Sequence, residues 1–481
     1  MESEVEYQKS TAIFLSWLQE NGVRMNPKMK LADLRSEGRG RGVVAVDDFL
    51  EDEVVFSIPR AAVLNVKNSL TASDTSTTQS AADALSALPP WLALTAVLVS
   101  EGSRQDSKWS PYLAVLPREL DSLVFWNESE LAELQASAVV NKIGRSSAEE
   151  MFSQHIAPLG LNNCSTELCH RVASIIMAYA FDIPDFSESD TAQSKPSLEE
   201  DGDDLVSDDG EDERTVLSMI PLADMLNADA DRNNARICCD NEDLEMRTIK
   251  PISKGEEIFN DYGQLPQSDL LRRYGYQSDN YAVYDVAEIP TTSIMAAVQA
   301  SVLPQLEPLS ATEVEKRIGL AQREDIYEDS YDVAHADMEN PSIPDELLAL
   351  LYILLLDHEN IQLLENSQSS LPSRSKLATE LVGQFLAAIL KEREKEYNTT
   401  LEEDAQLLKS ELPRRTTMAI KVRMGEKEVL RKALKEASSF QGNNKRMRLL
   451  DNTESAAPNS NSNGKRSREE TTRPKKKGRY N

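Results

Sequence analysis

The sequence predicts an α+β protein, in which a region of short strands with a helical insertion precedes an all-helical C-terminal region. Short β-rich runs, separated by acidic turns and a proline, predict a small antiparallel sheet at residues 42–46, 53–58 and 62–66, and short strands return at 235–239 and 244–250. Between these runs, from about residue 80 to 181, apolar residues recur every three or four positions, which is typical of helices. After residue 292 helical patterns replace strand patterns almost completely.

Individual elements follow from local patterns. Residues 11–18 place four apolar side chains on one helical face, and residues 256–263 and 281–289 predict two further strands. A stripe of residues four positions apart predicts a helix through Leu377, Leu381, Phe385 and Ile389. Thr400 and Glu403 form a capping box that opens the next helix, and Leu430, Ala433 and Leu434 mark the last one.

The predicted organisation has three parts, at residues 1–291, 292–440 and 441–481. The first contains the helical insertion and an acid-rich, apolar-poor run at 187–214, which is expected to be a disordered surface loop. The second is expected to be helical, and the third to be a disordered basic tail. The net charge is 52 − 81 = −29, and a surface this acidic favours a basic protein partner over nucleic acid.

Four cysteines in 481 residues, without paired zinc-ligand spacing, are expected to be thiols in a reducing compartment, and no metal site is expected. The acidic N-terminus lacks the apolar core of a signal peptide, and the apolar run at 347–356 is too short to span a membrane. We therefore expect a soluble intracellular protein.

Two polar residues interrupt the apolar run "PLADMLNADADRN", at Asp224 and Asn227. A buried carboxylate or amide destabilises a fold unless its hydrogen bonds are made, so this run is a candidate site. A Gly-x-Gly turn, Gly38-Arg39-Gly40-Arg41, precedes an early strand, where glycine lets a backbone approach a ligand. By itself this turn is better explained as a flexible basic turn.

A third segment, "GEEIFNDYGQ", ends a predicted strand at Tyr262 beside a glycine. A single tyrosine in such a place is more often a core residue than a catalyst, and the same holds for Tyr179 and Tyr274. The order of the three segments carries more information: a Gly-x-Gly turn, a "DxxN" run and "GEEIxxxYG" resemble the SET-domain methyltransferases.

The resemblance extends to the Rubisco-methyltransferase-like branch of that family. "SKWSPYLAVLP", "FWNESELAEL" and "MAYAF" are similar to its helical insertion, and "YNTTLEEDAQLLKSELPRRTTMAIKVRMGEKEVL" is similar to its C-terminal helical substrate-binding domain. Together the matches run from about residue 11 to 437. The resemblance implies a SET β-fold with knot-like threading of the "DxxN" segment beside the Tyr-Gly segment, followed by an all-α substrate-binding domain.

The resemblance also implies a site for S-adenosylmethionine. Arg39, Gly40 and Arg41 correspond to the cofactor-binding turn, and Asn227 to a cofactor contact. Asp224 is expected to be satisfied by backbone or cofactor groups. Tyr262 is the expected catalytic residue, which orients a lysine amine. The remaining implied cofactor contacts are Tyr179, Tyr274 and Ala228. Many relatives carry arginine at position 179, position 274 is aromatic in the family, and most relatives carry histidine at position 228.

The implied activity is methylation of a protein lysine, because a sulfonium methyl donor requires a neutral amine as acceptor. Similarity to a subgroup that includes fungal ribosomal lysine methyltransferases implies a protein of the large (60S) ribosomal subunit as substrate. Alternatives are a non-enzymatic acidic adaptor or chaperone, methylation of a nuclear non-ribosomal protein, and histidine methylation. An inactive relative also stays open, because of Ala228.

Two compact basic clusters in the tail, at residues 465–468 and 473–479, are typical of a bipartite nuclear import signal. They predict a nuclear import receptor as a partner and a nuclear protein that is also found in the cytoplasm. A solvated tail and weak RNA contact are the alternatives, and no sequence-specific nucleic-acid binding is expected.

Overall fold

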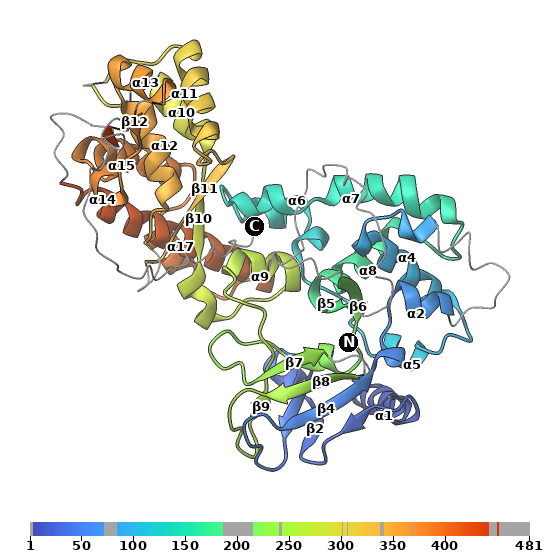
Figure 1. The fold of residues 1–481 in the computed structure, drawn as a ribbon. Helices are drawn as coiled ribbons and strands as arrows, with labels where there is room; N and C mark the ends of the chain where they lie inside the picture. The colour runs from blue at the N-terminus through green and yellow to red at the C-terminus, as the bar shows by residue number, and fades with distance from the viewer. Residues whose placement is uncertain are drawn as a thin grey trace, which may run out of the picture.

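The computed structural model describes residues 3–71, 84–185, 215–239, 243–300, 302–304, 306–336, 341–367, 369–441 and 450–451. These residues form an N-terminal lobe, from α1 to α9, and a helical lobe, from β10 to α17 (Figure 1). The acidic run at 187–214 and the basic clusters of the tail, which carry the predictions of disorder and of nuclear import, lie outside the described residues.

Two antiparallel sheets form the base of the N-terminal lobe. The four-stranded sheet has the order β1-β4-β8-β7, with bounds Arg24–Met25, Val54–Pro59, Asp243–Thr248 and Ala235–Cys239. The three-stranded sheet has the order β2-β3-β9, with bounds Met29–Asp33, Arg41–Ala45 and Glu257–Ile258. A separate pair joins β5 and β6, at Ala180–Pro184 and Thr215–Met219. Strands from both ends of this region therefore pair with one another, across the helical insertion.

The insertion and its flanks are helical, as predicted. The helices of this lobe are α1 (Glu4–Glu20), α2 (Val66–Thr71), α4 (Pro90–Ser103), α5 (Ser110–Leu113), α6 (Glu128–Ala132), α7 (Arg145–Met151), α8 (Thr166–Tyr179) and α9 (Gln267–Tyr274). Helices α4 and α8 pack against each other, and α1 packs against α5. The large core of the lobe fills the space between α1, the strands and this pair.

The helical lobe contains α10 (Thr291–Gln299), α11 (Ala311–Arg323), α12 (Asp345–Leu355), α13 (His358–Glu365), α14 (Arg374–Leu377), α15 (Glu380–Lys395), α16 (Leu401–Leu407) and α17 (Arg414–Ala437). The capping box predicted at Thr400 and Glu403 is present at the start of α16. No single helix in the described ranges is long and apolar enough to cross a membrane. Helices α12 and α13 meet that criterion only as a pair bent by 120°.

Several strand predictions need correction. The strand predicted at 256–263 is limited to β9, Glu257–Ile258. The run at 62–66 is not a strand, because Asn65 accepts a hydrogen bond from the backbone N–H of Asn68 and opens α2, which leaves only an isolated bridge at Leu64. The first half of 281–289 forms a 3₁₀ turn, and β10 spans only Val286–Pro290. An additional strand, β11 (Ser330–Ala334), pairs with β10 inside the region predicted to be helical, since buried side chains alternate along it.

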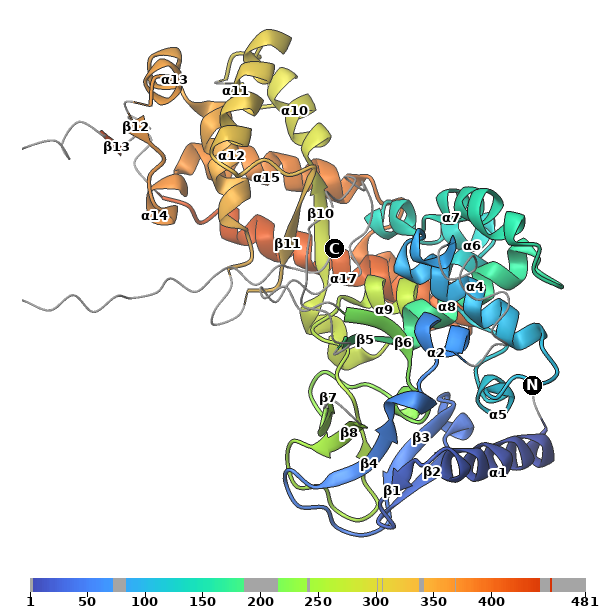
Figure 2. The same ribbon diagram turned by 45° about the vertical axis from the view of Figure 1, so that its right-hand side comes forward.

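Helix α17 connects the two lobes, and in both views it leaves the helical lobe and passes beside α9 (Figures 1 and 2). Its residues Met418, Ala419 and Val422 share a buried cluster with residues of the insertion and of α9, including Trp126 and Leu271. The lobes are thus joined through a common apolar cluster as well as through the chain that links them.

Candidate active site

The run that contains Asp224 and Asn227 leaves β6 through an unusual backbone turn. Leu222 has φ 81° and ψ −41°, a conformation that a branched L-residue rarely adopts, and its side chain is fully buried. A short 3₁₀ turn follows at Ala223–Met225. Strained backbone of this kind persists only where the surrounding packing holds it, and it is concentrated at functional sites.

Asp224 is buried, and its main partner is a tyrosine of the insertion. The hydroxyl of Tyr112, in α5, donates to Oδ2 of Asp224 over 2.5 Å. The other oxygen, Oδ1, is buried and has no hydrogen-bond partner within the described part of the chain. Burial raises the pKa of Asp224 to about 7, although the hydrogen bond from Tyr112 acts to lower it. Sequence reasoning expected backbone or cofactor groups here and missed Tyr112.

Three further tyrosines gather near Asp224. The rings of Tyr262 and Tyr274 stack in parallel, with centroids 4.3 Å apart and an interplanar angle of 3°. Tyr179 ends α8, and burial, followed by the nearby Asp224 and Tyr274, raises its pKa to about 12. Burial and the same neighbours raise the pKa of Tyr262 well above its usual range. The phenols of Tyr179 and Tyr262 are therefore neutral at physiological pH, and each of these two oxygens can both donate and accept a hydrogen bond.

The "DxxN" and Tyr-Gly segments lie side by side, as the sequence predicts. Ala228 and Asn260 form a parallel bridge. The backbone N–H of Asn260 donates to the carbonyl of Asn227 over 2.9 Å, and the N–H of Asp229 donates to the carbonyl of Asn260 over 3.3 Å. These bonds come from the main chains of Asn227 and Asp229, on either side of Ala228, so they do not depend on which side chain occupies position 228.

The remaining Asn and Asp residues of the run stabilise this arrangement. Asn234 donates from its side chain to the carbonyl of Glu257 and accepts from the N–H of Phe259, so it mimics a strand partner. One oxygen of Asp229 accepts from the N–H groups of Asp231 and Arg232. The polar cluster that follows Asn227 is explained by these local bonds and needs no ligand.

Asn227 is directed towards the Gly-x-Gly turn. Its Nδ2 donates to Oε1 of Glu257 over 2.6 Å and to the carbonyl of Arg41 over 3.4 Å. The other oxygen of Glu257, Oε2, pairs with the guanidinium of Arg39. A Cβ on Gly40 would meet nothing within 4 Å, so open space lies over the turn. Glu257 was not singled out from the sequence, although it lies in the quoted "GEEI" motif.

Arg41 contributes its carbonyl to this group. Its guanidinium donates to Ser10, Thr11 and the carbonyl of Val115, and it stacks on the ring of Tyr7. The side chain therefore extends towards α1. The structure brings Arg39 and Asn227 together around Glu257, with Gly40 next to Arg39 in the chain, and it brings Tyr179, Tyr262 and Tyr274 together near Asp224.

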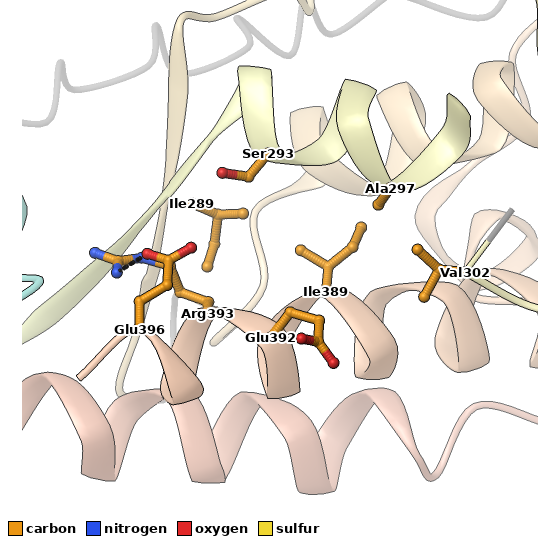
Figure 3. Close-up of a pocket in the computed structure, with 8 residues that line it drawn as sticks. All are labelled: Ile289, Ser293, Ala297, Val302, Ile389, Glu392, Arg393 and Glu396. Carbon is orange, nitrogen blue, oxygen red and sulfur yellow. Dashed lines mark hydrogen bonds and ion pairs between the residues drawn. The ribbon is translucent and has the colours of Figure 1, made fainter. Parts of the chain in front are cut away.

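A small cavity lies elsewhere, in the helical lobe, between β10, α10 and α15 (Figure 3). Its volume is about 40 Å³, which leaves room for only a few water molecules. Ile289, Ala297 and Ile389 form its apolar surface, and at its rim Arg393 pairs with Glu396 over 2.6 Å. It is too small for a cofactor and contains none of the predicted site residues. Within the described ranges, no group of three or more His, Cys, Asp or Glu side chains is arranged to hold a metal ion.

Comparison with protein families matches residues 40–263 to the SET domain and residues 309–430 to the Rubisco LSMT substrate-binding domain. Ribosomal lysine N-methyltransferase 4 of Saccharomyces cerevisiae is 33% identical over 310 residues, which cover 61% of this chain and 60% of the relative. The protein of the same name in Schizosaccharomyces pombe is 26% identical, covering 66% and 76%. N-lysine methyltransferase setd6 of Xenopus laevis is 30% identical, covering 55% and 56%.

The chain thus spans about three fifths of the length of the Saccharomyces relative. Among solved structures, "Crystal structure of the SET domain of LSMT bound to Lysine and AdoHcy" superimposes with a TM-score of 0.66 at 21% identity, covering 89% of this chain and 91% of that one. "Structure of Rubisco LSMT bound to AdoMet" gives 0.64 at 21% identity, with 89% and 92% covered. At this level of identity, the likeness establishes a shared fold.

Proposed function

We propose that this chain, which carries a SET domain followed by a Rubisco LSMT substrate-binding domain, is a protein-lysine N-methyltransferase that uses S-adenosylmethionine. The observation that carries the proposal is that Tyr179, Tyr262 and Tyr274 gather near Asp224. Asp224 is buried and lies on the same loop as Asn227. Burying several hydroxyl groups does not stabilise an apolar core, whereas a site that orients an amine requires such groups.

The residues present fit the cofactor. Asn227, Arg39 and Gly40 would hold it, since Asn227 Oδ1 receives no hydrogen bond from the described residues and Gly40 is sterically open. The buried and unpartnered Oδ1 of Asp224 adds an acceptor suited to a cationic ligand. S-adenosylmethionine supplies an electrophilic methyl group on a positively charged sulfur.

The protein must bind the acceptor lysine as a neutral amine. A free lysine has a pKa of about 10.4, so nearly all of it is protonated at neutral pH. A buried site disfavours the ammonium, and the neutral hydroxyl of Tyr262 can accept a hydrogen bond from the amine and direct its lone pair. We assign Tyr262 the catalytic role on this ground, with Tyr274 stacked on its ring to fix the orientation. Much of the rate enhancement then comes from positioning.

The bonding around Ala228 favours an active enzyme over an inactive relative. The two main-chain hydrogen bonds that join its neighbours to Asn260 are intact, and Asn227 keeps both of its side-chain contacts. An imidazole at this position is therefore not needed to hold the loop. The non-enzymatic adaptor hypothesis accounts for the acidic charge but gives no role to Tyr262 or to the loop around Asn227.

The proposed substrate is a basic protein, specifically a ribosomal protein of the large (60S) subunit. The net charge of −29 favours encounter with a basic partner, and two fungal relatives are named as ribosomal lysine methyltransferases. A nuclear non-ribosomal protein is the second candidate. We also propose nuclear import through the basic clusters at 465–468 and 473–479, which would let the enzyme meet ribosomal proteins before assembly.

The test is methyl transfer from labelled S-adenosylmethionine to purified large-subunit ribosomal proteins, with Tyr262→Phe as the inactive control. Mass spectrometry of the labelled protein locates the modified residue. Labelling of a lysine that depends on Tyr262 supports the proposal. Labelling of a histidine, or cofactor binding without transfer to any basic protein, would contradict it.

A further inference from the structure

Glu257 connects three segments that are distant in the sequence. It lies in β9, its Oε1 accepts from Asn227, and its Oε2 pairs with Arg39 on the Gly-x-Gly turn. Only 9% of its side chain is exposed, so solvent competes weakly for these bonds. No role in the proposed reaction requires Glu257 itself to touch the cofactor or the lysine.

We propose that Glu257 is a positioning residue, which fixes the orientation of the Asn227 amide and so determines affinity for the amino-acid part of the cofactor. This inference rests on the proposed function. An amide can present either its NH₂ or its oxygen in a given direction, and the ligand contact depends on which one it presents. Because the NH₂ of Asn227 faces Glu257 and the Arg41 carbonyl, its oxygen faces away from them. That oxygen can accept from the α-ammonium of the cofactor, a group that only donates.

A carboxylate is the only side chain of this size that can serve both neighbours. Both of its oxygens accept, and both Arg39 and Asn227 donate to it. In Glu257→Gln one oxygen is replaced by an NH₂ group. If the remaining oxygen pairs with the Arg39 cation, which is the stronger bond, the new NH₂ faces Asn227. The Asn227 amide must then turn over and offer its own NH₂ to the α-ammonium.

A second substitution separates this mechanism from general damage. In Asn227→Asp alone, the new carboxylate faces Glu257 and the two negative charges repel each other. In the double variant Glu257→Gln with Asn227→Asp, the NH₂ of residue 257 donates to one oxygen of residue 227. The other oxygen is again an oriented acceptor. The double variant should therefore bind better than either single variant, which a structural role for Glu257 does not predict.

The experiment is calorimetric titration of the full chain with two ligands. S-adenosylhomocysteine carries the α-ammonium and carboxylate, whereas 5′-methylthioadenosine lacks both. Glu257→Gln should weaken S-adenosylhomocysteine binding by about 10- to 100-fold, the usual effect of losing a hydrogen bond to a charged group. It should change 5′-methylthioadenosine binding by less than about threefold, because that ligand does not reach Asn227. Glu256→Gln, at the exposed neighbouring position, is the matched control and should change neither.

Selective loss in Glu257→Gln, with recovery in the double variant, supports the inference. Equal loss for both ligands, or a double variant no better than the single ones, overturns it and leaves Glu257 with a structural role. If the wild-type chain binds neither ligand, the proposed function fails as well. If the wild type binds S-adenosylhomocysteine and Glu257→Gln binds it equally well, only the inference fails.

Discussion

Replacing Tyr112 by phenylalanine should make stability more sensitive to pH, because it removes the side-chain donor that Asp224 has among the described residues. The pKa of Asp224 is about 7 in the folded protein, raised by burial from 3.8. A hydrogen bond to a charged group contributes about 1.5–3 kcal/mol, so its loss should raise this pKa further, by about 1–2 units. The variant must then keep Asp224 protonated over a wider pH range.

The sign follows from proton linkage. A carboxyl group whose folded pKa lies above its unfolded pKa stabilises the fold at low pH, and this contribution is lost as pH rises through the folded pKa. Both proteins should lose stability between about pH 5.5 and about pH 8, and Tyr112→Phe should lose about 1 kcal/mol more than the wild type. Urea denaturation at both pH values measures this difference.

Tyr331→Phe is the matched control. Tyr331 is equally buried, but its hydroxyl bonds only to the backbone of Ile326 and Glu328, which do not titrate there. Its loss of stability should be the same at both pH values. If Tyr112→Phe behaves like this control, Asp224 does not titrate near neutrality, and the Tyr112 hydrogen bond does not determine its pKa.

Three other substitutions and one localisation experiment give separate tests of the site, of a second buried carboxyl group and of nuclear import. Tyr262→Phe should lower the methylation rate far more than it weakens cofactor binding, because its hydroxyl acts on the amine; a rate near that of the wild type would refute the assignment. Asn227→Ala should weaken cofactor binding about 10-fold or more while the far-UV circular dichroism stays unchanged, and unaltered affinity by calorimetry would refute that contact. Between about pH 5.5 and about pH 8 the wild type should lose about 2 kcal/mol of stability through Glu426, because burial raises the pKa of this carboxyl group to about 7. Glu426→Gln should lack this loss, and an unchanged pH dependence in urea denaturation would contradict this. Alanine at all three lysines of 475–477, in a fluorescent fusion, should shift the protein towards the cytoplasm, and an undiminished nuclear signal would reject nuclear import.

Local patterns in the sequence pointed to the segments of the candidate site, and their resemblance to the SET-domain methyltransferases implied that these segments approach one another. Asp224 and Asn227 stood out because polar residues inside an apolar run need partners, and the parallel bridge between Ala228 and Asn260 confirms that their loop lies beside the Tyr-Gly segment. A polar residue inside an apolar run is a local feature, so it can be recognised within a few residues of sequence.

The partners that complete the site could not be predicted in this way. Tyr112 is 112 positions from Asp224, and in the sequence it is one tyrosine in an insertion whose helices look like ordinary core. Glu257 is 30 positions from Asn227, and nothing in the sequence distinguishes it from the acidic residues around it. The strand predicted at 62–66 failed for a related reason, since the side chain of Asn65 caps α2 and outweighs the β propensity of its neighbours.

These long-range pairs give the helical insertion a direct part in the site. Tyr112 comes from α5 and Tyr179 from the end of α8, whereas Asp224, Tyr262 and Tyr274 come from segments after the insertion. The strands of both antiparallel sheets lie outside the insertion, but the apolar core that packs on them includes residues of the insertion such as Leu94 and Tyr112. Without the insertion Asp224 would lack its hydroxyl donor, and a buried carboxylate without that bond favours protonation. The insertion therefore sets the charge of Asp224 at neutral pH, in addition to covering the core.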